Sequence, residues 1–499
     1  MDSLIKKIRS EILNERLVFF LLFISFLLRT YRLNELLGFW YDQGRDALVV
    51  WDFLYKGKLF LIGPEMGFTG IFRGPWYYWL ITPFYALSQG NPLLPAYFLV
   101  TISVIAIYIA YKLTKEISGK LPALLVVLVA SVSFYLIDSA RWLSNPTPMF
   151  LISIVFLWSL YRYLDGRWWS LPLASFTLSM GLNFGAAAEL FYIPVLFFVV
   201  LTNKKKFPGV KIAAASIVIF AVGFLPQILF ELRHEGVYVN AIRNFLIADK
   251  SFTINFLQVV LGRLSFYYTL IASKFWTNAD IVFAPFLFAA VGLVVTNWKA
   301  FKKNNKFVIL LVLVLVPIVG TFFFRGNKGN IYDYYFTGYY LYFIIFFAVS
   351  FAVLFKSNLG RLFLGTFIVL LLIFNAKAYV GKYTLSLDDP EIIAFENQRR
   401  ALDWVYDDAN GEEFNIDVYV PPVIPYAYNY LVQWHESKLC NIKKCARTTQ
   451  TVPLLYTLSE VDINAPYRLS KWFVRQNSIG KVNESKRFGG ITVERRIRN

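Results

Sequence analysis

Acidic and basic side chains follow the first hydrophobic stretch of the chain, in the segment Tyr41-Asp42-Gln43-Gly44-Arg45-Asp46-Ala47. Apolar residues recur after it at the spacing of an amphipathic helix: Ala47, Leu48, Trp51, Leu54 and Tyr55. Such a helix lies in the interface plane of a membrane, and it carries Asp42, Arg45 and Asp46 on one face. A carboxylate held there could serve as a general base. The alternative is structural: Asp42 caps the helix and Arg45 pairs with a neighbouring acid.

A second candidate segment is Phe72-Arg73-Gly74-Pro75-Trp76-Tyr77-Tyr78-Trp79-Leu80, which predicts a turn that enters an aromatic helix. Arg73 stands at the start of that helix. A guanidinium beside the free backbone amides of a helix start suits a phosphate group. The alternative is that Arg73 only extends towards lipid headgroups.

Three further polar clusters stand at the ends of hydrophobic stretches. They are Asp138, Arg141 and Asn145; Glu231, Arg233 and His234; and Arg325, Lys328 and Tyr335. The predicted topology places every cluster on the outer side of a membrane. Ordinary polarity at helix ends would scatter such residues over both faces, so their convergence predicts a site at the outer surface.

The composition indicates the elements that must position these residues. The chain has 499 residues, 57% of them hydrophobic and 16% charged, whereas a soluble domain carries about 25% charged residues. Many apolar runs are long enough to cross a ~30 Å hydrocarbon core. We predict a polytopic α-helical membrane protein with about eleven spans, at 17–33, 93–112, 120–137, 147–163, 168–182, 188–202, 208–230, 280–298, 307–324, 335–355 and 360–380. No small-residue cleavage site follows the first span, which predicts that it is retained.

The net charge of +18 admits nucleic-acid binding as one interpretation, but the topology explains the charge better. Lysines gather in alternate short loops, at 112–120, 203–211 and 299–306. Basic loops stay in the cytoplasm, so the N-terminus is predicted to be cytoplasmic. An odd number of spans then places residues 383–499 outside, across the plasma (inner) membrane.

The outer segments differ in kind. Residues 252–273 predict an amphipathic or shallowly embedded helix within the loop 231–279. The tail predicts a helix from Glu391 to Asp408 and a strand from Asn415 to Val420. We therefore predict a transmembrane domain over 1–382 and a small extracytoplasmic α/β domain over 383–499. Cys440 and Cys445, the two cysteines, could form a disulfide there or stay free, and their spacing offers too few ligands for zinc.

Together these motifs resemble the GT-C glycosyltransferases, in particular the family of the protein O-mannosyltransferases and the lipid A aminoarabinose transferase. Those enzymes carry an Asp-Glu motif on a juxtamembrane helix after the first span, where this chain has Asp42-Gln43. Phe72 to Trp79 is similar to their second loop motif. Ser144-Asn145-Pro146 stands where many members have Asp-Pro. Phe230 to His234 resembles a sequence motif that is common among bacterial relatives. The resemblance covers about residues 15–380. Two positions depart from it, because Gln43 and Asn145 each replace a carboxylate.

The resemblance implies transfer of a sugar, with inversion, from a polyprenyl phosphate donor to a lipid, glycan or protein acceptor at the outer face. Inversion in one step needs one general base, for which Asp42 is the first candidate and Asp46 and Glu231 are substitutes. The phosphate candidates are Arg73, Arg141, Arg233, Lys328 and Arg325. The predicted sugar pocket contains Tyr41, Trp76, Tyr77, His234 and Asn145. Gln43, Arg45, Asp138 and Tyr335 complete the predicted substrate-binding set. No cofactor is firmly implied and no ligand spacing indicates a metal, although acids and a histidine on the outer face could recruit a divalent ion.

Other classes use similar residues. A transporter or flippase of an anionic lipid would need the same basic side chains, but ionisable residues within the predicted spans are few, and paired broken helices are not evident. A lipid-linked polysaccharide polymerase or ligase would use a pyrophosphate-linked donor and is expected to place its main outer loop later in the chain. A non-catalytic binding scaffold is the alternative that Gln43 and Asn145 leave open.

Overall fold

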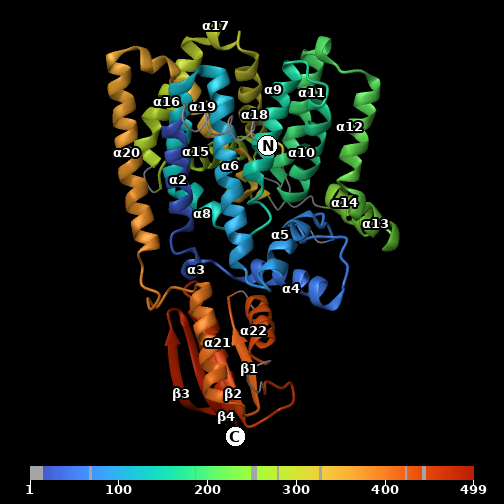
Figure 1. Ribbon diagram of the computed structural model, residues 1–499, viewed down its shortest axis with the longest axis vertical. Coiled ribbons are helices and arrows are strands. Elements are labelled where there is room, and N and C mark those ends of the chain that lie inside the picture. The colour runs from blue at the N-terminus through green and yellow to red at the C-terminus, as the bar shows by residue number, and fades with distance from the viewer. Residues whose placement is uncertain are drawn as a thin grey trace, which may run out of the picture.

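A computed structural model describes residues 15–66, 70–185, 187–248, 255–277, 280–324, 329–421, 424–440 and 446–498. Long helices form a bundle, a small sheet lies beyond one end of it, and the first outer loop lies between the two (Figure 1). The bundle contains α2 (Arg16–Thr30), α6 (Leu93–Ser118), α7 (Lys120–Val132), α8 (Phe134–Ala140), α9 (Met149–Leu164), α10 (Ser170–Phe184), η1 (Ala187–Phe191), α11 (Tyr192–Thr202), α12 (Val210–Val222), α15 (Phe256–Ala272), α16 (Asp280–Thr296), α18 (Asn305–Thr321), η4 (Asp333–Tyr339), α19 (Tyr340–Ser350), η5 (Phe351–Lys356) and α20 (Asn358–Tyr383).

A helix occupies the place of each predicted span. By length and apolar composition, four helical stretches of the described chain could cross a membrane alone, and two bent helix pairs could each form one more span. Phe256–Ser273 is one of the four, although the sequence predicts a shallow helix there. The chain is therefore a multi-pass membrane protein, and the count of about eleven spans stays a prediction.

Two stretches that the sequence predicts as continuous spans are broken. Helices α7 and α8 meet at 63°, and α12 meets α13 (Leu225–Arg233) at 55°. At the first break, the Arg29 guanidinium donates to the Ala130 carbonyl (2.8 Å), and the Asn375 side chain accepts from the Phe134 N–H (2.7 Å). Backbone groups freed by a bend need such partners because the bilayer core offers no water.

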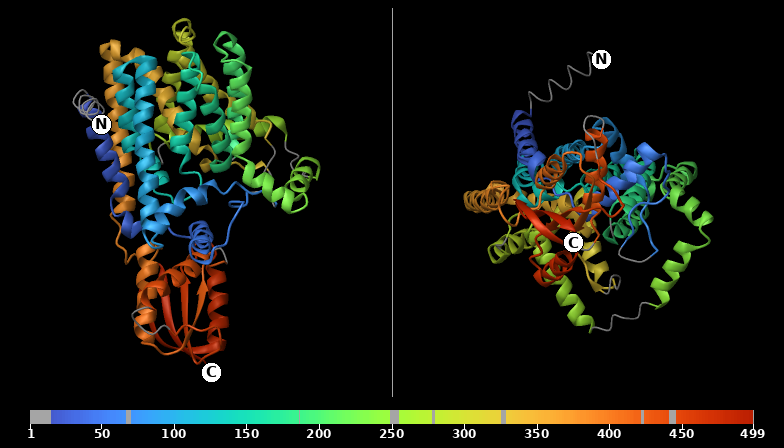
Figure 2. Two further views of the ribbon diagram at one scale, coloured as in Figure 1. Left: turned by 45° about the vertical axis from the view of Figure 1, so that its right-hand side comes forward. Right: turned by 90° about the horizontal axis from the view of Figure 1, so that it is seen from below.

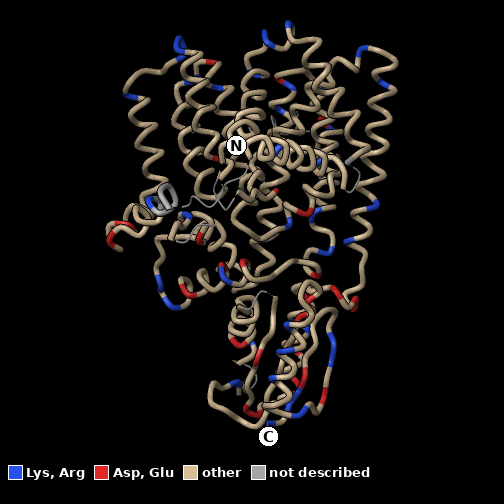
Figure 3. Tube along the Cα trace, turned by 180° about the vertical axis from the view of Figure 1, so that it is seen from behind, with Lys and Arg blue, Asp and Glu red and all other residues tan. Residues whose placement is uncertain are grey.

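Lysine and arginine gather at the end of the bundle that faces away from the sheet (Figure 3). This end carries the short loops in which the sequence places its lysine clusters. The distribution agrees with the positive-inside rule. The cytoplasmic N-terminus and the plasma-membrane location stay predictions.

The C-terminal segment forms a four-stranded sheet in the order β1-β2-β4-β3. Strand β1 (Phe414–Tyr419) runs parallel to β2 (Leu454–Glu460), whereas β4 (Ile491–Arg498) is antiparallel to both β2 and β3 (Gly480–Phe488). Three helices accompany the sheet: α21 (Phe395–Ala409), α22 (Tyr426–Leu439) and α23 (Pro466–Ile479). The predicted helix and strand are thus confirmed to within a few residues, while the domain boundary at 382 stays a prediction. Cys440 is disulfide-bonded, and Cys445 lies outside the described residues.

The C-terminal segment docks onto the first outer loop, which contains α3 (Leu33–Leu36), α4 (Tyr41–Lys56) and α5 (Trp76–Leu87) (Figures 1 and 2). The Phe395 N–H donates to the Leu37 carbonyl (3.0 Å), and the Trp434 indole donates to the Gln89 carbonyl (3.0 Å). Helix α22 crosses α4 at Gly44, where an added Cβ would lie 2.2 Å from the Ala427 backbone nitrogen. The two helices approach this closely because Gly44 has no side chain.

Gly44→Ala is expected to destabilise the protein by about 1–3 kcal/mol, because neither backbone can move away without disturbing its own helix. Thermal unfolding of the purified protein measures the loss. Gly365→Ala on α20 is the matched control, since no heavy atom lies within 4 Å of the Cβ it would introduce. Equal unfolding temperatures for the two variants would contradict this account of the interface.

Candidate active site

Helix α4 brings its two aspartates to one arginine, as the sequence predicts. The Arg45 guanidinium contacts Asp42 at 2.8 Å and Asp46 at 2.7 Å. The helix is capped by Trp40, whose N–H donates to the Gln43 side chain (3.1 Å). Asp42 lies in the first helical turn, so its carboxylate is not the N-cap.

The two carboxylates differ in what they can reach. The Asp46 side chain is 3% exposed and accepts hydrogen bonds from Arg45 and from the Tyr78 hydroxyl (3.1 Å). Burial raises the pKa of Asp46 to about 6, although Arg45 lowers it. The Asp42 side chain is 47% exposed. Asp42 therefore has room for a substrate group, whereas Asp46 is enclosed by protein.

The Arg73 segment lies beside the polar turn that follows α8. Arg73 donates to the Phe184 carbonyl (3.3 Å), and Asn145 donates to the same oxygen (2.9 Å). Burial lowers the pKa of the Arg73 guanidinium. The nearby Glu189 carboxylate opposes this effect and raises the pKa, whereas Arg45 lowers it further.

A glycine holds this segment in place. The Gly74 N–H donates to the Asn183 side chain (3.0 Å), and an added Cβ on Gly74 would lie 2.2 Å from that oxygen. Trp76 opens helix α5 and donates to the Gly223 carbonyl (2.7 Å) at the bend between α12 and α13. The second bend therefore anchors the Arg73 turn.

An apolar groove of about 700 Å³ begins at Trp76 and runs between α9, α10 and α12. Its walls are formed by large apolar side chains: Trp158, Trp169, Leu173, Phe176, Met180, Ile219 and Val222. A groove of this kind suits a hydrocarbon chain. Trp76 places the groove next to Arg73, so a lipid tail and its phosphate could be held together.

A polar cavity of about 680 Å³ lies between the bundle and the C-terminal segment. Asp138 lines it and accepts hydrogen bonds from Lys382 (2.6 Å) and the Tyr383 hydroxyl (2.8 Å). Arg141 also lines it, but donates to the Arg29 and Tyr31 carbonyls (3.2 and 2.7 Å). The predicted phosphate candidate Arg141 thus secures the end of the first span.

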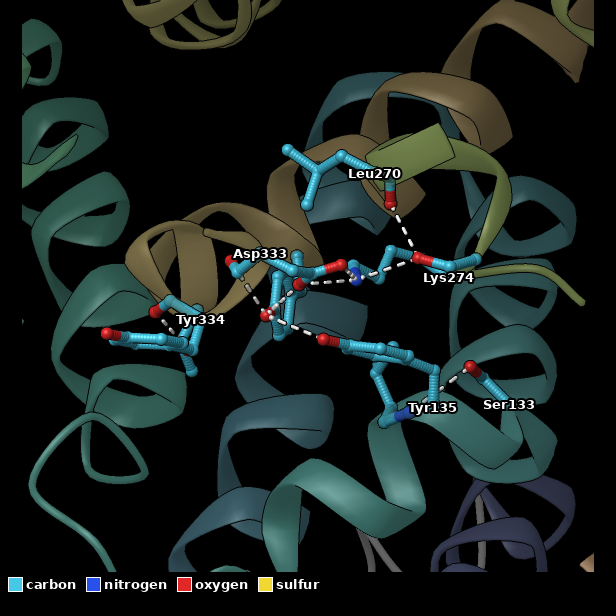
Figure 4. A network of polar contacts seen from close by, with 10 residues as sticks. Ser133, Tyr135, Leu270, Lys274, Asp333 and Tyr334 are labelled. Atoms are coloured by element: carbon cyan, nitrogen blue, oxygen red, sulfur yellow. Dashed lines mark hydrogen bonds and ion pairs between the residues drawn. The ribbon is translucent and has the colours of Figure 1, made fainter. Parts of the chain in front are cut away.

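One wall of the cavity is a network that the sequence analysis missed (Figure 4). The buried Lys274 ammonium lies 2.8 Å from Asp333 and 3.2 Å from the centre of the Tyr135 ring. The Tyr340 hydroxyl donates to the same carboxylate (2.5 Å). Asp333 and Tyr135 both face the cavity. The sequence signals were a single lysine in an aromatic stretch and an aspartate among tyrosines.

Tyr334 connects the cavity with the arginine segment. It lines the cavity and lies edge-on to Trp142 with ring centres 5.9 Å apart. Tyr335 packs against Tyr334 with ring centres 4.8 Å apart, and both tyrosines raise the pKa of Arg73, which burial lowers. Trp40 also lines the cavity and is the N-cap of α4. The cavity therefore reaches the start of the helix that carries Asp42.

Tyr41 and Tyr77, two further predicted pocket residues, flank the α4 carboxylates. The Arg45 guanidinium lies 5.9 Å from the centre of the Tyr41 ring, which packs edge-on against Tyr426. Tyr77 is buried. Burial raises the pKa of its hydroxyl, and the Asp46 carboxylate raises it further. Tyr41 can therefore orient Arg45, while Tyr77 forms part of the packed support.

The predicted residues of α13 lie beside the Arg73 segment, because the Phe72 ring packs edge-on against Phe230 with ring centres 6.0 Å apart and the Phe72 carbonyl accepts from the Tyr238 hydroxyl (2.7 Å). Both Glu231 oxygens accept backbone N–H groups at the start of α14 (Val237–Ala248), from Tyr238 (2.8 Å) and Val239 (3.1 Å). His234 is exposed and stacks on Phe230 with ring centres 4.0 Å apart, and Arg233 is exposed beside it. Glu231 therefore acts as a helix cap, and this cluster does not join the α4 carboxylates. Arg325 and Lys328 lie outside the described residues.

The C-terminal segment contributes two acids to the cavity, Glu391 and Glu460, and the sequence analysis predicted neither as a site residue. Glu460, at the end of β2, is 5% exposed and accepts hydrogen bonds from Tyr428 (3.0 Å) and Gln398 (3.3 Å). Burial raises its pKa to about 7. Within the described ranges, no three or more His, Cys, Asp or Glu side chains are grouped so that they could hold a metal ion.

Glu460→Gln is expected to stabilise the fold increasingly as the pH rises. Folding retains the Glu460 proton up to about pH 7, whereas the unfolded chain releases it near pH 4.3. The wild type therefore loses stability between these values, by about 4 kcal/mol in total. Thermal unfolding at pH 5 and pH 8 measures the difference in stability between Glu460→Gln and the wild type. The variant should exceed the wild type in stability by much more at pH 8 than at pH 5. A gain that does not depend on pH would refute the assignment.

Comparisons with known proteins identify the fold that positions these residues. Residues 73–230 match the family model described as dolichyl-phosphate-mannose-protein mannosyltransferase. The chain is similar to ArnT from Cupriavidus metallidurans bound to undecaprenyl phosphate, with 10% identity, a TM-score of 0.56, and coverage of 97% of this chain and 98% of that one. It is also similar to the oligosaccharyltransferase AglB from Archaeoglobus fulgidus in complex with an inhibitory peptide and a dolichol-phosphate, with 12% identity, a TM-score of 0.51, and coverage of 96% and 74%. The search of curated proteins finds no match. The fold is therefore the GT-C fold of membrane glycosyltransferases.

Proposed function

We propose that this chain, with its GT-C fold, transfers a sugar from a polyprenyl phosphate donor to an acceptor at the outer face of the membrane. The observation that carries the proposal is the position of Asp42. Its half-exposed carboxylate is paired with Arg45 and follows two residues after Trp40, which lines the polar cavity. Arg73 stands three residues before Trp76, which lines the apolar groove. A donor with a lipid tail, an anionic leaving group and a sugar fits this set of groups.

In this proposal the tail occupies the groove at Trp76, Arg73 binds the phosphate, and Arg45 orients the Asp42 carboxylate. The phosphate gains negative charge as the bond to the sugar breaks, so the Arg73 guanidinium stabilises the transition state more than the ground state. The acceptor hydroxyl attacks the anomeric carbon from the face of the sugar opposite the phosphate, and Asp42 accepts the proton of that hydroxyl. One displacement inverts the anomeric carbon, and no covalent intermediate forms. Gln43 in place of a second carboxylate is compatible with this mechanism.

Lipid transport is the second candidate, because the two bent helix pairs are a feature that transporters also use. The buried Lys274–Asp333 pair could then lie on a translocation route. Transport does not require an exposed carboxylate that could act as a base. The half-exposed Asp42 carboxylate therefore favours sugar transfer over transport.

Reconstitution in liposomes tests the proposal. A panel of radiolabelled polyprenyl phosphate sugars is supplied with total membrane extract as acceptor, and both donor loss and labelled product are measured. Consumption of one donor with formation of a labelled product is the expected result. Lipid movement across the bilayer without consumption of any donor would replace transfer by transport.

A further inference from the structure

The polar cavity combines carboxylates with aromatic rings on its walls. Asp138, Asp333, Glu391 and Glu460 line it, together with Trp40, Trp142 and Tyr334. Carboxylates accept hydrogen bonds from hydroxyl groups, and aromatic faces pack against the apolar C–H faces of a sugar ring. The volume of about 680 Å³ lies in the range of small-ligand sites.

Two of these carboxylates already have cations that balance their charge. Lys382 pairs with Asp138, and Lys274 pairs with Asp333. A cationic ligand would therefore gain little from either acid. Neutral hydroxyl groups can still donate to a carboxylate that is paired, because each carboxylate offers about four lone-pair positions. With Arg141, three cationic side chains accompany the four carboxylates of the cavity. This near balance of charge favours a neutral, hydroxyl-rich ligand over a cation.

Glu460 comes from the C-terminal segment and is tied to the start of α4. Gln398, which donates to Glu460, also donates to the Phe39 carbonyl (2.9 Å), and Phe39 directly precedes Trp40. A ligand that contacts Glu460 would lie within the cavity that Trp40, the N-cap of α4, also lines.

From these contacts we infer that the cavity binds the acceptor, that the acceptor is a carbohydrate, and that Glu460 is a specificity-determining residue that binds its hydroxyl groups. This inference rests on the proposed function, because only a transferase needs an acceptor. It assigns to the C-terminal segment a part of the acceptor site in addition to its structural contacts.

The experiment supplies two kinds of acceptor to reconstituted protein: hexyl glycosides of mannose, glucose and galactose, and an N-acetylated octapeptide that contains threonine. Initial rates against acceptor concentration give KM and kcat separately. We expect transfer to at least one glycoside. Glu460→Gln should raise the KM for that glycoside about tenfold while kcat changes less than KM. Asp417→Asn on β1, whose carboxylate accepts hydrogen bonds from Arg475 and Gln476 outside the cavity, is the matched control and should leave both constants unchanged.

The outcomes separate the two proposals. Transfer to the peptide in preference to every glycoside, or an unchanged KM in Glu460→Gln, would overturn the inference and leave the transferase proposal standing. If wild-type protein consumes no donor, the proposed function fails. Glycoside binding, followed by the intrinsic tryptophan fluorescence of wild type, Trp40→Phe and Trp142→Phe, then tests the cavity separately. A saturable change that depends on either tryptophan and that Glu460→Gln weakens supports carbohydrate binding. Equal signals in wild type and both tryptophan variants, or no saturable change, overturn it.

Discussion

Asp42→Asn is expected to lower sugar transfer by roughly 10²–10⁴-fold, the range over which a positioned general base contributes to a rate. The amide keeps the size of the side chain but cannot take the proton of the acceptor hydroxyl. The loss should appear in kcat, because the base acts on the transition state. Rates of donor consumption and product formation by reconstituted protein measure it.

Asp46→Asn distinguishes the base from its neighbour. Asp46 is enclosed by Arg45 and Tyr78, so its replacement should affect stability and the position of Arg45 more than proton transfer. The Asp46 variant should keep the pH profile of the wild type with a smaller loss of rate. A small effect of Asp42→Asn beside a complete loss in Asp46→Asn would move the role of the base to Asp46.

Arg73→Gln is expected to lower the rate by about 10²–10³-fold, since it removes a donor directed at the developing charge of the leaving phosphate. The affinity for the donor should fall less than the rate, because the phosphate carries more negative charge in the transition state than in the ground state. Single-turnover kinetics, which separate donor binding from the chemical step, provide the measurement.

Arg73→Lys and Arg233→Gln complete this test. Lysine keeps the charge but loses the planar, forked geometry, so Arg73→Lys should recover only part of the rate. Arg233 is exposed at the end of α13, and its replacement should leave the rate within about twofold, well inside the scatter of surface substitutions. An Arg73→Gln rate equal to that of the wild type would show that other groups bind the phosphate.

The helices and the face of α4 could be predicted from the sequence, because both follow from local geometry. Apolar runs of sufficient length fold into helices wherever the bilayer removes water from the backbone. Asp42, Arg45 and Asp46 meet because residues three and four apart lie side by side on any helix. The start of α5 after Arg73 follows from similarly local signals.

Which distant clusters meet was decided by the tertiary structure alone. Arg73 and Asn145 share the Phe184 carbonyl, Lys274 pairs with Asp333, and Glu460 reaches the cavity from the end of β2. Each contact joins residues far apart in the chain, so no hydrophobic periodicity or local motif spacing in the sequence could predict it. Glu231 shows the converse: its sequence context resembles a site, but neighbouring backbone amides occupy both of its oxygens.

The bends in α7–α8 and α12–α13 have the same origin. A helix can break inside a membrane only where partners satisfy the freed backbone groups, and here Arg29, Asn375 and Trp76 come from other helices. By itself the sequence determined a multi-pass membrane protein with an acidic and basic helix after its first span. The tertiary structure decided that Asp42 is the accessible acid and that the C-terminal segment closes a cavity beside it, because accessibility depends on what packs around a side chain.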